Sequence, residues 1–84
     1  MAKVILYTSG FCSYCVQARR LLDAKGVAYD ELYVDQDPEL RTQMVSRSQR
    51  RSVPQIFIGN YHVGGFEDMR QLDKSGQLDT LLKG

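Results

Sequence analysis

The first 34 residues alternate between two short extended runs and one amphipathic segment, and this β-α-β pattern constrains the fold most. Residues 4–7 read Val-Ile-Leu-Tyr, an almost continuously apolar run typical of a central strand covered by helices on both faces. Apolar side chains recur at three- and four-residue spacings in residues 12–25, which predicts a helix that Gly26 ends. In residues 29–34, Leu32 and Val34 alternate with Glu31 and Tyr33, which is typical of a half-exposed strand nearer the sheet edge. A right-handed crossover would make the two strands parallel.

The middle of the chain predicts a second helix and a hairpin. Asp37-Pro38 matches an N-cap followed by proline at the first helical position, and the helix should run to about Ser48. Residues 55–58 and 61–63 are β-rich runs separated by Gly59-Asn60, a two-residue connection that favours a tight antiparallel hairpin.

The last 20 residues predict a third helix, which starts after Gly64-Gly65 and ends near Gly76, followed by a docking turn with leucines at 78, 81 and 82. The expected architecture is α/β in the order βαβαββα. With 84 residues, 43% of them hydrophobic and 25% charged, the chain is expected to form one globular domain over residues 1–84.

The charge balance argues against several classes of partner. Eleven basic and ten acidic side chains give a formal charge of +1, which offers no broad field for nucleic acid or an anionic membrane. The apolar run of residues 4–7 is far shorter than the roughly 20 residues of a membrane span, and shorter than the apolar part of a signal peptide. A cytoplasmic location is therefore expected.

Both cysteines fall in the tetrapeptide Cys12-Ser13-Tyr14-Cys15. A disulfide between them would close a loop of four residues and stabilise the fold by about 2 kcal/mol by the chain-entropy estimate. A reactive role therefore explains the pair better than a structural disulfide. Two alternatives stay open. The pair would be half of a structural zinc site, for which His62 is the only further candidate, or two inert buried thiols.

The predicted topology brings Cys12 to a favourable place for reaction. The loop of Ser9 to Phe11 would leave the carboxyl end of the first strand, where ligands collect in open α/β sheets, and deliver Cys12 to a helix start. Unpaired N–H groups and the helix dipole there favour the thiolate. Cys15, three residues on, lies on the same face inside the helix and is expected to be the resolving thiol.

At this point the sequence resembles a dithiol glutaredoxin of the thioredoxin-fold superfamily, with a Cys-Ser-Tyr-Cys variant of the active site. Four motifs in order carry the resemblance: Tyr7-Thr8, Cys12-Ser13-Tyr14-Cys15, Ser52 to Ile58, and Gly64 to Asp68. It implies a four-stranded mixed sheet flanked by helices, and a glutathione-dependent oxidoreductase that reduces protein–glutathione mixed disulfides and protein disulfides. Cys12 and Cys15 would be catalytic.

The resemblance also implies a site for glutathione. The Val53-Pro54 peptide would be cis, with the Val53 backbone pairing with the cysteinyl part, and Asp68 would bind the γ-glutamyl ammonium. Tyr14 would lie along the tripeptide or merely cover the disulfide. The residues implied around glutathione are Tyr14, Arg51, Ser52, Val53, Pro54, Gly65, Phe66, Glu67 and Asp68.

Arg47, Arg50 and Arg51 are candidates for the glycyl carboxylate of glutathione, although a solvated helix end explains any one of them equally well. Two departures from the family pattern concern the thiolate. Ser13 stands where proline is common, and Ser9 where lysine is frequent, so one helper for Cys12 and one candidate for the carboxylate are missing.

Small residues in place of that proline also occur in family members that resemble cluster carriers. The second function class is therefore a dimer that shares a 2Fe-2S cluster through Cys12 and two glutathione thiols. A thioredoxin-like reductase served by a flavoenzyme is a third alternative. Without a cluster, the chain is expected to act as a monomer that holds no metal.

Overall fold

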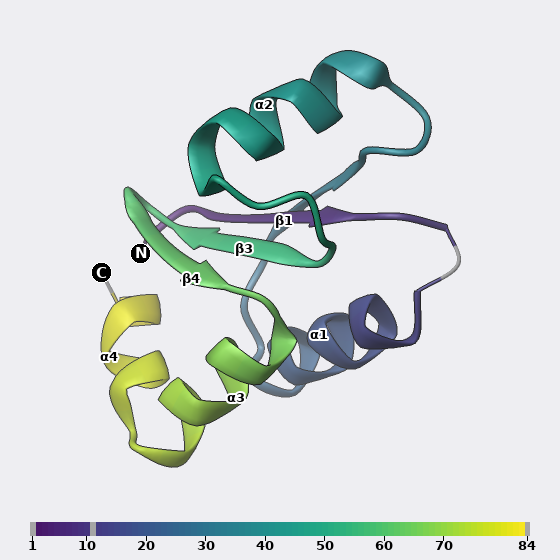
Figure 1. Cartoon of the computed structure of the whole chain (residues 1–84). Helices are drawn as coiled ribbons and strands as arrows, with labels where there is room; N and C mark the ends of the chain where they lie inside the picture. Colours follow the sequence, from purple (N-terminus) through teal and green to yellow (C-terminus); the bar gives the residue numbers. More distant parts are fainter. Residues whose placement is uncertain (1, 11, 84) are drawn as a thin grey trace.

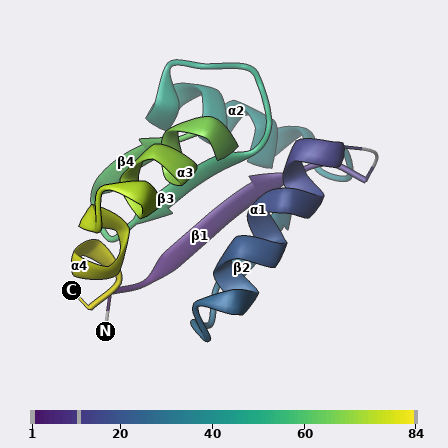
Figure 2. The same ribbon diagram turned by 90° about the horizontal axis from the view of Figure 1, so that it is seen from below.

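The computed structural model describes residues 2–10 and 12–83, in which helices cover both faces of a four-stranded sheet (Figure 1). The strand order is β2-β1-β3-β4, with β1 parallel to β2 and antiparallel to β3, and β3 antiparallel to β4. Helix α2 lies on one face, and α1, α3 and α4 lie on the other (Figures 1 and 2). The elements are β1 (Val4–Thr8), α1 (Ser13–Ala24), β2 (Asp30–Tyr33), α2 (Pro38–Ser48), β3 (Gln55–Ile58), β4 (Tyr61–Gly64), α3 (Phe66–Lys74) and α4 (Gln77–Lys83).

Strand β1 is covered on both faces because alternate side chains enter different apolar clusters. Val4 and Leu6 belong to the cluster beneath α1, α3 and α4, whereas Tyr7 belongs to the cluster beneath α2. Thr8 at the end of the strand is also fully buried. The predicted central strand is confirmed, and its carboxyl end is the fixed point from which the chain enters α1.

Helix α1 buries one side against the sheet. Cys15, Ala18 and Leu22 are fully buried, and their spacings of three and four residues place them on one helical face. Figure 2 shows α1 beside α3 on the same side of the sheet. The helix predicted over residues 12–25 is confirmed, with Cys12 as its N-cap.

Two elements differ from their predicted limits. Strand β2 lies at the sheet edge as predicted but is shorter, although the Val34 N–H still donates to the Thr8 carbonyl at 2.9 Å. The predicted docking turn is a helix, α4, so the order is βαβαββαα rather than βαβαββα. Leu78 and Leu82 are both buried there. Seven residues span only about two turns, which is too few for periodicity alone to reveal a helix.

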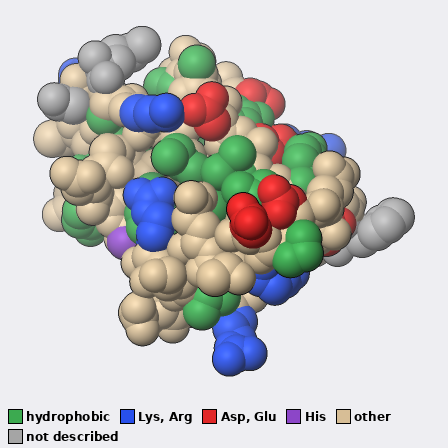
Figure 3. Space-filling model, turned by 90° about the horizontal axis from the view of Figure 1, so that it is seen from above, with side chains coloured by type: hydrophobic (Ala, Val, Ile, Leu, Met, Phe, Trp, Pro, Cys, Tyr) green, Lys and Arg blue, Asp and Glu red, His purple; other side chains and the backbone are tan. Residues whose placement is uncertain are grey.

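Charged side chains of both signs are scattered over the α2 side of the molecule (Figure 3). This distribution agrees with the near balance of basic and acidic residues in the sequence. Within residues 2–10 and 12–83, none of the helices combines the length and the apolar character needed to span a bilayer.

The turn after α2 delivers the chain to the candidate site. Helix α2 ends at Ser48, and Gln49 then adopts the left-handed conformation with φ 61° and ψ 23°. The Arg50 N–H donates to the Ser48 hydroxyl at 3.0 Å, which closes the turn. A Cβ atom on a residue in this conformation costs about 1–2 kcal/mol, and glycine, which has none, avoids that cost.

We therefore expect Gln49→Gly to raise the free energy of unfolding by about 0.5–1 kcal/mol, since relief of the left-handed strain exceeds the backbone entropy that glycine adds to the unfolded chain. Urea denaturation at constant m-value is the measurement. Gln49→Val serves as the control and should lower stability, because a β-branched residue fits this conformation worst. Equal stabilities of the three proteins would contradict the interpretation.

Candidate functional site

Cys12 caps the first turn of α1 with its own sulfur. Its backbone is extended, with φ −148° and ψ 111°, and its Sγ accepts the Cys15 backbone N–H at 3.2 Å. Donors of this first turn and the positive end of the helix dipole stabilise negative charge on the sulfur. Cys12 is only half-buried, so a disulfide substrate has access to it. The predicted position at the N-cap is confirmed.

The approach to Cys12 is tied to the neighbouring strand. Gly10 follows β1, and its N–H donates to the Asp35 carboxylate at 3.0 Å. Asp35 lies just after β2, which pairs in parallel with β1, so the two carboxyl ends meet at one edge of the sheet. Phe11, the last residue of the predicted loop, lies outside the described residues.

Cys15 differs sharply from Cys12 in environment. It is fully buried, and this burial, with the contact to Cys12, raises the pKa of the Cys15 thiol to about 12. At neutral pH Cys15 is therefore a thiol while Cys12 is the accessible sulfur. Both cysteines are free. The alternative of two inert buried thiols is wrong, because only one of the pair is buried.

The loop between α2 and β3 lies against the reactive sulfur. The Cys12 Sγ–H donates to the Val53 carbonyl at 3.7 Å, and the Val53-Pro54 peptide is cis, as the family resemblance implied. The two contacts of the sulfur act in opposite directions. The Cys15 N–H stabilises a thiolate, whereas the Val53 carbonyl stabilises a thiol.

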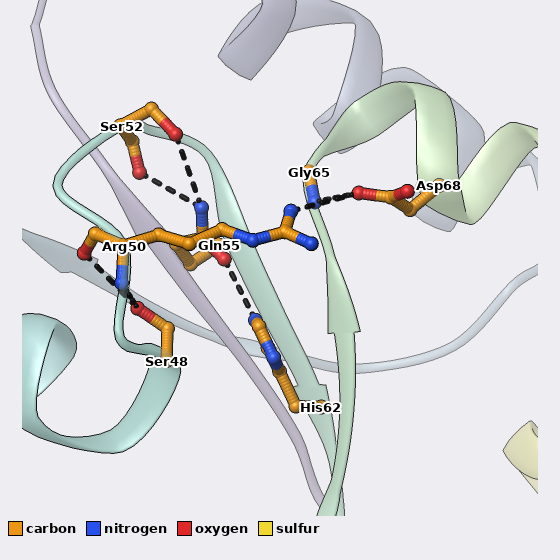
Figure 4. A network of polar contacts seen from close by, with 7 residues as sticks. All are labelled: Ser48, Arg50, Ser52, Gln55, His62, Gly65 and Asp68. Carbon is orange, nitrogen blue, oxygen red and sulfur yellow. Dashed lines mark hydrogen bonds and ion pairs between the residues drawn. The ribbon is translucent and has the colours of Figure 1, made fainter.

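A buried amide holds this loop in place (Figure 4). Gln55 of β3 is fully buried, and its Nε2 donates to the Ser52 carbonyl at 3.0 Å and the Ser52 hydroxyl at 3.3 Å. Its Oε1 lies 2.8 Å from Nε2 of His62 on β4. Burial, aided by the charge of Arg50, lowers the pKa of His62. His62 thus anchors the loop through Gln55, a role that the sequence reasoning missed.

The start of α3 faces the same loop. The Asp68 carboxylate accepts the Gly65 N–H at 2.9 Å and pairs with the Arg50 guanidinium at 3.0 Å (Figure 4). The Gly65 N–H, and then Arg50, lower the pKa of Asp68. Gly64 has φ 111°, and a Cβ on it would stand 2.4 Å from the Asp68 carboxylate oxygen. Only glycine therefore leaves the carboxylate in this position.

These segments enclose a groove of about 240 Å³ beside Cys12. Tyr14 forms one wall, 53% exposed, and its ring centroid is 6.4 Å from that of the buried Phe66. Eight of the nine residues predicted to surround glutathione line this groove, and Arg51 is the exception. The lining residues are Tyr14, Ser52, Val53, Pro54, Gly65, Phe66, Glu67 and Asp68.

The three arginines predicted for the glycyl carboxylate lie in different places. Arg50 reaches Asp68 at the opposite end of the groove from the one expected for it. The Arg47 guanidinium lies 4.1 Å from the centre of the Phe57 ring and donates to the Tyr7 hydroxyl at 3.1 Å, so it packs beneath α2. Arg51 lies outside the lining of the groove.

Arg51 shares a second hollow, of about 400 Å³, with Arg41. Arg41 Nη1 donates to the Arg51 carbonyl at 3.5 Å, and neither guanidinium is in an ion pair among the residues that the structure describes. The sequence reasoning missed Arg41, because ten residues separate it from Arg51 and α2 brings the two together. The hollow provides two cations close to the Val53 loop.

The described part of the chain offers no metal centre of its own. No group of three or more His, Cys, Asp or Glu side chains within it is placed to hold an ion. His62 bonds to Gln55 rather than joining the cysteines. The zinc alternative is therefore unsupported.

Comparison with known proteins agrees with this geometry. A sequence model of the glutaredoxin family matches residues 4–63. A glutaredoxin of Neisseria meningitidis is 53% identical over 83 residues, which cover 98% of each chain. Glutaredoxin 3 of Escherichia coli is 48% identical over 83 residues, 99% of this chain and 100% of that protein. The chain belongs to the glutaredoxin family.

A solved structure gives the same answer for the fold. Buckwheat glutaredoxin in complex with glutathione superposes with a TM-score of 0.89 and 25% identity, over 98% of this chain and 77% of that one. The predicted glutaredoxin resemblance and thioredoxin-like α/β fold are confirmed. As a glutaredoxin, the chain is a glutathione-dependent thiol–disulfide oxidoreductase that acts with glutathione and glutathionylated proteins. The findings do not favour the cluster-carrier alternative.

The two glycines before α3 make a matched test of the glutaredoxin groove. Gly64→Ala should lower the free energy of unfolding by about 1–3 kcal/mol, because its Cβ collides with Asp68 and φ 111° suits glycine alone. Gly65→Ala should cost less than about 1 kcal/mol, since its Cβ meets the Pro54 carbonyl at an ordinary 3.6 Å. Chemical denaturation distinguishes them, and equal losses would contradict this account of Gly64.

Proposed function

We propose that this glutaredoxin removes glutathione from proteins through Cys12 alone. The Cys12 thiolate attacks the glutathione sulfur of a protein–glutathione disulfide, and the protein leaves as a thiolate that takes a proton from water. A second glutathione thiolate attacks the Cys12-bound glutathione, which forms glutathione disulfide and regenerates the Cys12 thiolate. Each cycle consumes one reduced glutathione and exchanges the protein–glutathione disulfide for glutathione disulfide, so the number of disulfide bonds is conserved. The supporting observation is a half-exposed sulfur at the N-cap of α1, facing the Val53 loop.

Glutathione would lie along the groove, with its cysteinyl backbone against Val53. The γ-glutamyl end carries a carboxylate and an ammonium, and the start of α3 offers matching partners. Asp68 would bind the ammonium, and the first-turn N–H groups near Gly65 the carboxylate. Arg50 already pairs with Asp68, so the Asp68 carboxylate would bind both Arg50 and the ligand ammonium. The Arg50 guanidinium would also attract the α-carboxylate of the γ-glutamyl group. Tyr14 and Phe66 would cover the tripeptide.

The glycyl carboxylate would lie at the other end, near Arg51 and Arg41. Their shared hollow adjoins the Val53 loop, and two guanidinium groups that form no ion pair with any described residue suit a carboxylate. This pair would supply the positive charge that lysine often supplies in the family at the position of Ser9.

Cys15 adds a second, dithiol route for protein disulfides. The Cys12 thiolate would open the target disulfide, and Cys15 would then attack Cys12, release the second target thiol and close a Cys12–Cys15 bond that two glutathione molecules reduce. Every group invoked comes from one chain, which supports action as a monomer. The cytoplasm supplies the reduced glutathione that both routes consume, so we place the activity there.

Substitution of each cysteine by serine separates the two routes. Cys12→Ser should abolish deglutathionylation, because the remaining thiol, Cys15, is buried. Cys15→Ser should retain it and lose at least tenfold in reduction of a protein disulfide, since no resolving thiol is left. Turnover of a glutathionylated peptide and of a disulfide-bonded protein measures the two activities. Full deglutathionylation by Cys12→Ser would refute the proposal.

Truncated thiols test the orientation of glutathione. The mixed disulfide of cysteinylglycine lacks the γ-glutamyl group, and that of γ-glutamylcysteine lacks the glycyl carboxylate. Asp68→Asn should raise KM about three- to tenfold for glutathione and γ-glutamylcysteine but leave cysteinylglycine unchanged. The double variant Arg41→Gln, Arg51→Gln should raise KM for glutathione and cysteinylglycine instead. Identical effects on all three substrates would contradict the orientation.

A further inference from the structure

The dithiol route, which rests on the function proposed above, requires a buried thiol to become a nucleophile. Burial, with the contact to Cys12, raises the pKa of the Cys15 thiol to about 12. At pH 7 a thiol of that acidity is almost entirely protonated. Any fixed positive charge near Cys15 therefore has a direct effect on how fast it attacks Cys12.

Arg19 holds such a charge. It follows Cys15 by four residues, so it lies one turn further along the same side of α1. Cys12 and Arg19 are the titratable side chains whose charges act on Cys15, and the guanidinium lowers the pKa that burial raises. Glu31 and Tyr33, both on β2, act in turn on Arg19.

A polar network fixes the guanidinium between helix and sheet. Arg19 Nη1 lies 2.5 Å from Glu31 Oε2, and the Thr8 hydroxyl donates to the same oxygen at 2.8 Å. The side chains of Arg19 and Glu31 are only 26% and 16% exposed, and Thr8 is fully buried. A hydrogen bond from the Ser9 backbone, next to Thr8, lowers the pKa of Cys15. The guanidinium is thus held between α1 and β2, one helical turn from the resolving thiol, rather than moving into solvent.

We propose that Arg19, held against β2 by Glu31 and Thr8, is a positioning residue for the resolving step and sets the balance between the monothiol and dithiol routes. In that step Cys15 loses its proton to water and attacks Cys12 Sγ in a mixed disulfide. The Cys12–Cys15 bond forms, and the bound thiol leaves as a thiolate. The Arg19 charge favours the Cys15 thiolate that this step requires.

The competing interpretation is that the Arg19–Glu31 ion pair only joins α1 to β2. The two interpretations predict different effects of removing Glu31 on the rate at which the Cys12–Cys15 bond closes. If the pair only holds the helix, loss of either partner slows closure. If the positive charge of Arg19 assists closure, removal of Arg19 slows it. Removal of the Glu31 carboxylate then leaves the Arg19 charge uncompensated and does not slow closure. Glu31→Gln keeps the size of the side chain and an oxygen that accepts from Arg19.

The experiment measures ring closure in a single turnover. Reduced protein reacts with dithiobis(nitrobenzoate) at Cys12, and the slower release of the second thionitrobenzoate reports the attack by Cys15. The rate is followed by stopped-flow absorbance between pH 6 and about 9, well below the Cys15 titration. A tenfold smaller fraction of Cys15 thiolate is partly offset, because a more basic thiolate is the better nucleophile. With a Brønsted slope near 0.5, the closure rate then falls about threefold.

In Arg19→Gln the Cys12–Cys15 bond should form at least about threefold more slowly than in the parent protein across this pH range. Arg19→Lys should restore most of the rate, because it keeps the positive charge. Glu31→Gln should close at least as fast as the parent. Lys25→Gln is the matched control. Lys25 follows Cys15 by ten residues and pairs with Asp73 and Asp79. Loss of these ion pairs should leave the closure rate unchanged.

Slow closure in both Arg19→Gln and Glu31→Gln would overturn the proposal in favour of a joining role, and an unchanged rate in Arg19→Gln would overturn it outright. Deglutathionylation by Cys15→Ser protein, with and without Arg19→Gln, should be equal, since the resolving thiol is absent from both. If Cys12→Ser protein stays active, the proposed function fails, whatever the closure rates are.

Discussion

The hydrogen bond from the Cys15 backbone N–H to the Cys12 sulfur joins the reactive atom to the start of α1, and the chemistry of the site depends on it. That helix start is fixed because β1 is buried on both faces and α1 packs across it through Ala18 and Leu22. The same interaction separates the two thiols. Cys12 is half-exposed at the N-cap, whereas Cys15 lies on the buried face of the helix. One helical turn thus provides both an attacking and a resolving sulfur.

The surroundings of that turn are assembled from distant parts of the chain. Gln55 and His62 hold the loop that carries Val53, and Asp35 holds Gly10 in the segment between β1 and Cys12. These contacts join the ends of three strands to the loops around the sulfur. The groove is therefore shaped before a ligand arrives, which reduces the entropy lost on binding.

The sequence was sufficient for the elements with strong local patterns. Strand β3 and helix α2 have their predicted bounds, since a dense β-rich run and an Asp-Pro start mark them. Helix α4 was missed because two turns carry too little periodicity.

Side-chain partners across the sheet were harder to predict. Arg47, Arg50 and Arg51 lie within five residues of sequence, yet they point to Phe57, to Asp68 and to the hollow with Arg41. The left-handed turn at Gln49 separates Arg47 from the other two. The direction in which each long side chain leaves the backbone depends on that turn, and residue type alone does not specify it.

The pairing of Arg50 with Asp68 has an electrostatic consequence for ligand capture. With Arg70 also close to Glu67 at 3.8 Å, opposite charges at this end of the groove compensate one another before anything binds. A γ-glutamyl zwitterion brings no net charge either. Long-range attraction thus adds little to its encounter rate, and recognition there depends on short-range contacts that ionic strength screens only weakly.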